Sequence, residues 1–147
     1  MQFGWINLFG AVIVALMLLP NIVYALRHKG ETAACASRVM AILEQVGRYG
    51  CIVLMWLPLL VWEFGFSGKA GLLAYLFGNG ALLVAYLLVW ALYARHKTRA
   101  EAVALAVLPT CIFLLSGLLL RHWLLVGFAV LFGVGHIFVT LDTYRAE

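Results

Sequence analysis

Five apolar stretches, each long enough to cross a lipid bilayer as a helix, constrain this chain more than any motif in it. We place them at residues 3–26, 39–63, 70–94, 101–120 and 123–142. A helix needs about 20 residues to cross roughly 30 Å of hydrocarbon. The five stretches therefore use nearly all of the 147 residues. The sequence predicts an all-α integral membrane protein, a compact bundle of five transmembrane helices that forms a single membrane domain over residues 1–147.

Composition and the placement of charge agree with this prediction. Hydrophobic residues make up 66% of the chain and charged residues 11%, whereas a soluble domain has roughly 45–50% and about 25%. The basic residues lie mainly in the first connection, in the third connection and after the last stretch: Arg27, Lys29, Arg38, Arg95, Lys97, Arg99 and Arg145. Cytoplasmic loops carry such an excess. We therefore expect an N-terminus outside, a cytoplasmic C-terminus and a location in the cytoplasmic (inner) membrane of a bacterium.

The sequence contains no signature of a cofactor, a metal or a nucleic acid. No phosphate-binding loop, nucleophile elbow or HExxH pattern occurs, and the three cysteines show no CxxC spacing. The net charge of +4 lies in short loops, where membrane topology accounts for it. We expect membrane lipids as partners and no nucleic acid, no metal and no cofactor.

The segment 41–50 is unusual because it places polar groups inside an apolar stretch. Glu44 and Arg48 are four residues apart, so on a helix they lie on one face and can pair. Counted from the cytoplasmic boundary, Glu44 lies about 8 Å deep and Arg48 about 14 Å deep. Charges at such depth are costly and usually face the bundle interior or a wet cavity. We expect this pair to face protein or water.

Other polar residues project to a similar depth in the cytoplasmic half. The predicted ligand-binding set contains Asn21 and Tyr24 from the first stretch, Glu44, Gln45 and Arg48 from the second, and His136 from the fifth, with Asn79 and Tyr86 of the third completing the wall. A planar guanidinium suits a carboxylate or phosphate. A carboxylate and an imidazole can exchange protons. The same pair can instead be purely structural, with Glu44 and Arg48 neutralising each other.

Three functional hypotheses follow from this set. The first is a small polytopic membrane protein that binds or translocates a small amphipathic or anionic, lipid-like molecule through a cytoplasm-facing polar pocket. The second is an enzyme acting on a lipid, with His136 and Glu44 as acid–base groups and Arg48 as the anion clamp. The third is a non-catalytic subunit that associates through stripes of small residues, either as a homodimer or with another membrane partner.

Overall fold

The computed structural model describes residues 6–29, 37–57, 59–60 and 65–145, which form five helices and no strand. The helices are α1 (Leu8–Arg27), α2 (Arg38–Trp56), α3 (Lys69–His96), α4 (Arg99–Leu119) and α5 (Trp123–Thr143). All five are long and apolar enough to cross a membrane. The prediction of five spanning-length helices in an all-α fold is confirmed.

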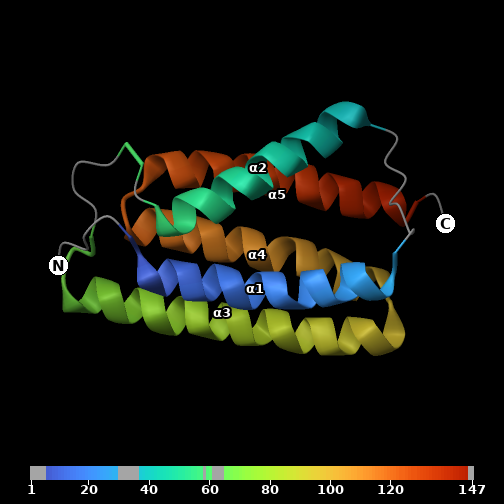
Figure 1. Cartoon of the computed structure of the whole chain (residues 1–147), viewed down its shortest axis with the longest axis horizontal. Helices are drawn as coiled ribbons and strands as arrows, with labels where there is room; N and C mark the ends of the chain where they lie inside the picture. The colour runs from blue at the N-terminus through green and yellow to red at the C-terminus, as the bar shows by residue number, and fades with distance from the viewer. Residues whose placement is uncertain (1–5, 30–36, 58, 61–64, 146–147) are drawn as a thin grey trace.

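The helices run alternately up and down, so that α1 begins at one end of the bundle and α5 finishes at the other (Figure 1). The end of α1, the start of α2, the α3–α4 connection and the end of α5 share one end. We call it the basic end, because it carries Arg27, Lys29, Arg38, Arg95, Lys97, Arg99 and Arg145. The opposite end, with the start of α1 and the α4–α5 turn, is the far end.

Two helix boundaries differ from the predicted ones for local reasons. Helix α1 begins at Leu8 because Asn7 caps it, accepting a hydrogen bond from the Gly10 amide at 3.1 Å. Helix α2 ends at Trp56, and Leu57 is extended (φ −106°, ψ 116°). The residue that follows Leu57 is a proline, which disfavours helical geometry in the residue before it. The remaining predicted ends, residues 3–5, 58 and 61–63, lie outside the described residues.

Helices α2 and α5 pack together through glycines. A β-carbon on Gly47 would lie 2.5 Å from the Phe132 nitrogen, and one on Gly135 would lie 2.6 Å from the Glu44 nitrogen. The two backbones therefore touch, as small residues allow in membrane helices. Helix α4 packs against both α3 and α5. Gly47 of α2 and Gly135 of α5 thus allow these two helices to approach closely.

Helix α1 is joined to α2 at the far end. The backbone N–H of Asn7 donates to the Trp56 carbonyl at 2.8 Å, and its side-chain Nδ2 donates to the Met55 carbonyl at 3.3 Å. Gly10 lies directly against the Met55 carbonyl oxygen. From this joint, α2 runs away from α1 toward the basic end (Figure 1). A space opens between them in the basic half of the bundle.

Candidate functional site

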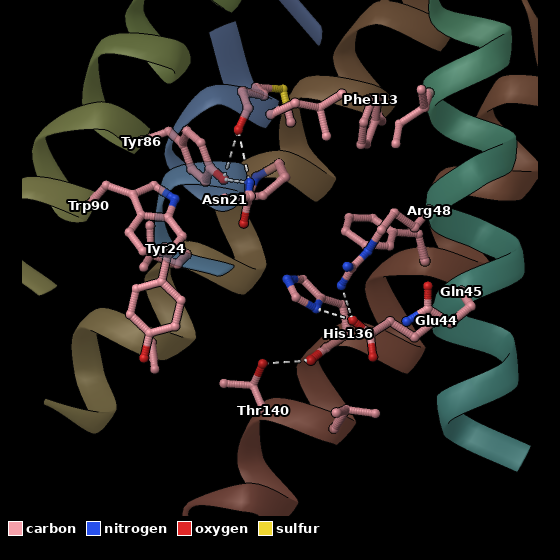
Figure 2. Close-up of a pocket in the computed structure, with 18 of the residues that line it drawn as sticks. Asn21, Tyr24, Glu44, Gln45, Arg48, Tyr86, Trp90, Phe113, His136 and Thr140 are labelled. Atoms are coloured by element: carbon pink, nitrogen blue, oxygen red, sulfur yellow. Dashed lines mark hydrogen bonds and ion pairs between the residues drawn. The ribbon is translucent and has the colours of Figure 1, made fainter. Parts of the chain in front are cut away.

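A cavity of about 630 Å³ fills this space. It lies between α1 and α3 on one side and α2 and α5 on the other (Figure 2). Pockets for drug-sized ligands span roughly 300–1,000 Å³. The structure brings seven of the eight predicted site residues to its wall: Asn21, Tyr24, Glu44, Gln45, Arg48, Tyr86 and His136.

Three ionisable side chains meet on one oxygen of the cavity wall. Oε1 of Glu44 accepts a hydrogen bond from Nη2 of Arg48, one helical turn away, and another from Nδ1 of His136 at 2.8 Å. The Glu44 side chain is only 8% exposed, whereas that of Arg48 is 37% exposed. The carboxylate is thus held inside the wall by two donors, and the guanidinium extends into the cavity. We call these residues the Glu44 triad.

The Glu44 triad depends on the contact between α2 and α5. Gly135, beside His136, lies against the backbone of Glu44, which places the imidazole within reach of the carboxylate. The His136 ring also stacks on Phe132, with ring centroids 4.8 Å apart and planes 20° apart. Two contacts therefore fix the orientation of the imidazole.

The geometry of His136 determines what it offers to a ligand. Because Nδ1 faces a carboxylate oxygen, it must carry the proton, and in the neutral ring Nε2 is then an acceptor. Nε2 points into the cavity (Figure 2). Protonation changes Nε2 into a donor and adds a positive charge beside Arg48. The cavity can thus present two cationic donors to one anionic group.

The opposite wall is built by α1 and α3. Asn21 Nδ2 donates to the Tyr86 hydroxyl at 2.7 Å and to the Met17 carbonyl at 2.9 Å. The Tyr86 hydroxyl donates to the same carbonyl at 3.4 Å. Pro20 prevents the regular hydrogen-bond pattern in this part of α1. The Met17 carbonyl therefore accepts hydrogen bonds from two side chains, one on α1 and one on α3.

Aromatic rings extend this wall toward the basic end. Tyr24 lies 5.4 Å from Trp90 and 6.1 Å from Tyr93, measured between ring centroids. The Tyr93 hydroxyl lies 3.0 Å from that of Tyr144, which closes the wall against the end of α5. Trp90, Tyr93 and Tyr144 line the cavity but are not in the predicted ligand-binding set. Trp90 and Tyr93 share a helix face with Tyr86, and Tyr144 lies two turns after His136 on the face of that residue.

The structure does not bring Asn79 to this cavity. Asn79 lies two turns before Tyr86 on α3, about 10 Å nearer the far end. It is fully buried and accepts a hydrogen bond from the Ser116 hydroxyl at 3.2 Å. The hydroxyl of Tyr75, one turn nearer the far end, accepts a hydrogen bond from Asn7 Nδ2 at 3.3 Å. Asn79 thus belongs to a separate polar contact between α3 and α4 in the far half.

Among the described residues, no three His, Cys, Asp or Glu side chains gather as a metal site. Comparison with protein families, curated proteins and solved structures found no match. We therefore infer the function from the cavity and the Glu44 triad.

Proposed function

We propose that this protein binds a small amphipathic molecule with an anionic group, which it holds or translocates through the cavity. The observation that carries the proposal is the Glu44 triad in the wall of a largely apolar cavity. Glu44 and Arg48 balance each other, so protonation of His136 gives the cluster a net positive charge. An anionic group beside Arg48 and His136 restores neutrality with charge-assisted hydrogen bonds.

We also propose that the five helices span the cytoplasmic membrane of a bacterium, with the basic end in the cytoplasm. The support is that the basic residues at the end of α1, the start of α2, the α3–α4 connection and the end of α5 lie at one end of the bundle, and the cytoplasmic loops of membrane proteins carry such an excess of Lys and Arg. In this orientation the N-terminus is outside, and the cavity lies in the cytoplasmic half. Lys97→Cys, treated with a membrane-impermeant maleimide, tests this orientation. We expect labelling only after cell lysis, and labelling in intact cells would contradict the orientation.

Calorimetric titration with octyl phosphate tests ligand binding, with octanol and octyltrimethylammonium as uncharged and cationic controls. The purified protein is expected to bind octyl phosphate saturably. Arg48→Gln is expected to weaken this binding about tenfold or more, because one charge-assisted hydrogen bond contributes roughly 1.5–3 kcal/mol. Arg95→Gln, which removes an exposed cation at the basic end outside the cavity, is the matched control and leaves the affinity unchanged.

A double variant distinguishes a purely structural role of Glu44 and Arg48 from a role in ligand binding. Arg48→Gln alone leaves the buried Glu44 without its cation and is expected to destabilise the fold. Glu44→Gln/Arg48→Gln removes both charges, so its stability recovers while its binding does not. Recovery of both properties in the double variant would show that the pair is structural only.

The contact between Glu44 and His136 favours a second candidate function, acid–base chemistry on a lipid. A carboxylate that holds an imidazole with its second nitrogen toward a cavity is an arrangement that general bases use. Incubating the protein with a bacterial lipid extract tests this candidate. It requires a product that disappears with His136→Ala and a rate that depends on pH. Unchanged lipids would contradict it.

A further inference from the structure

The cavity is bounded by α1 and α2 on the side where these helices diverge. They are hydrogen-bonded to each other at the far end, through Asn7, and the cavity separates them in the basic half. Asn21 of α1 and Gln45 of α2 both line the cavity and are both exposed. The cavity therefore has a mouth between α1 and α2, on the flank of the bundle, with a polar group on each side.

The lining changes in polarity along the bundle axis. Val14, Leu18, Ile52 and Phe113 surround the end nearer the middle of the bundle, and all are apolar. The Glu44 triad, Asn21 and Trp90 follow, and Tyr93 and Tyr144 lie nearest the basic end. On α1 the lining runs from Val14 to Tyr24, about 15 Å of helix. That length equals half of the roughly 30 Å hydrocarbon thickness of a bilayer, and the order of polarity is that of one leaflet.

We propose that the ligand is a single-chain anionic lipid from the leaflet at the basic end, and that it enters sideways between α1 and α2. This inference rests on the proposed function. The phosphate or carboxylate head binds Arg48 and His136, and the acyl chain points toward Phe113. A volume of about 630 Å³ suits a ligand of moderate size and favours one chain over two. A mouth on the flank lets the chain enter without crossing water.

Quenching of Trp90 fluorescence by a brominated acyl chain tests the ligand class, because Trp90 lines the cavity. The other four tryptophans are changed to phenylalanine, and the protein is placed in phosphatidylcholine nanodiscs. The probes are stearoyl lysophosphatidic acid, stearate and the uncharged stearoyl monoglyceride, each carrying two bromine atoms on the part of the chain next to the head, where the inference places them beside Trp90. At least one anionic probe is expected to quench Trp90 saturably at low mole fraction, and which one does so identifies the head as phosphate or carboxylate. Arg48→Gln in the same background is expected to weaken this quenching about tenfold or more.

A second single-tryptophan protein is the control for bulk lipid contact. Trp123 is 69% exposed and lies at the far end, so quenching there should rise without saturation for all probes alike. Equal behaviour of Trp90 and Trp123, or equal quenching of Trp90 by the uncharged monoglyceride, would overturn the inference. Equal competition by butyl phosphate and by unbrominated stearoyl lysophosphatidic acid would also overturn it. In that case octyl phosphate binding still supports the proposed function, whereas loss of all binding removes both.

The sideways route has its own test at the mouth. Gln45→Phe adds bulk at the mouth, whereas Val46→Phe adds it at the next position, which is exposed and does not line the cavity. When nanodiscs holding the protein are mixed with nanodiscs holding the anionic bromolipid, the onset of quenching should be slower in Gln45→Phe and unchanged in Val46→Phe. Equal onset in all three proteins would overturn the sideways route.

Discussion

Adding a single methyl group at Gly47 or Gly135 probes the contact on which the Glu44 triad depends. A β-carbon at Gly47 would lie 2.5 Å from the Phe132 nitrogen and 2.6 Å from its α-carbon. Both neighbours are backbone atoms, so no side chain can rotate away. Ordinary van der Waals contact begins at about 3.4 Å, so α2 and α5 must separate locally by almost 1 Å. Gly47→Ala and Gly135→Ala are therefore expected to strain the helix pair.

Two opposing terms set the size of the effect. Alanine favours a helix over glycine by roughly 0.5–1 kcal/mol. Overpacking a close contact costs typically 1–3 kcal/mol, occasionally more, and a backbone-to-backbone contact lies at the upper end of that range. The net expected loss in the free energy of unfolding is about 2–2.5 kcal/mol for each variant. Gly135→Ala also pushes Glu44 away from His136, so it should weaken octyl phosphate binding more than Gly47→Ala does.

The assay is unfolding in mixed micelles of dodecyl maltoside and sodium dodecyl sulfate, followed by circular dichroism. Gly127→Ala is the matched control, because Gly127 lies on α5, as Gly135 does, and a β-carbon there would meet nothing within 4 Å. That variant should be as stable as the parent protein or slightly more stable. If Gly47→Ala and Gly135→Ala are as stable as Gly127→Ala, the two helices do not touch through their backbones, and the explanation of the Glu44 triad is wrong.

Two further predictions concern the far end. His122 is fully buried in the α4–α5 turn, with Nε2 3.2 Å from the Leu59 carbonyl, and burial lowers its pKa below the ordinary value of 6.5. The unfolded chain therefore takes up this proton first, so the free energy of unfolding should fall as pH drops below about 6.5. The pH dependence of the free energy of unfolding is measured for the parent protein and for His122→Gln. The difference between the two is the contribution of His122, and a zero difference would contradict this prediction. Asn7→Ala removes the cap of α1 and the contacts with Met55 and Tyr75. It should cost about 1–3 kcal/mol, which a fall in the melting temperature measures, and an unchanged temperature would refute it.

The sequence was sufficient for the helices and for the positions of the polar residues along the bundle axis, because both follow from one-dimensional spacing. Glu44, Arg48 and His136 were predicted at similar depth, and the structure places them in contact. Depth alone does not specify which helices are neighbours. Asn79 shares a face with Tyr86, but the two turns between them place it beside Ser116, outside the cavity.

The joint at Asn7 went unrecognised in the sequence for a related reason. An asparagine before an apolar run is a common helix cap. Asn7 also bonds to the Met55 carbonyl and the Tyr75 hydroxyl, which are 48 and 68 positions away from it in the chain. Such contacts depend on how three helices meet, and no local pattern encodes them.

The hydrogen bonds at Asn7 also allow α1 to tilt about its first turn. Helix α1 is bound to α2 at Asn7, and Tyr24 lies 17 residues further on, at a distance of about 25 Å. A tilt of about 5° at the joint moves the Tyr24 end by about 2 Å, while the hydrogen bonds at Asn7 hardly change length. The contacts that resist this movement are the Asn21–Tyr86 hydrogen bond and the rings around Tyr24. The width of the mouth is thus governed by a few contacts between α1 and α3, although the mouth itself lies between α1 and α2.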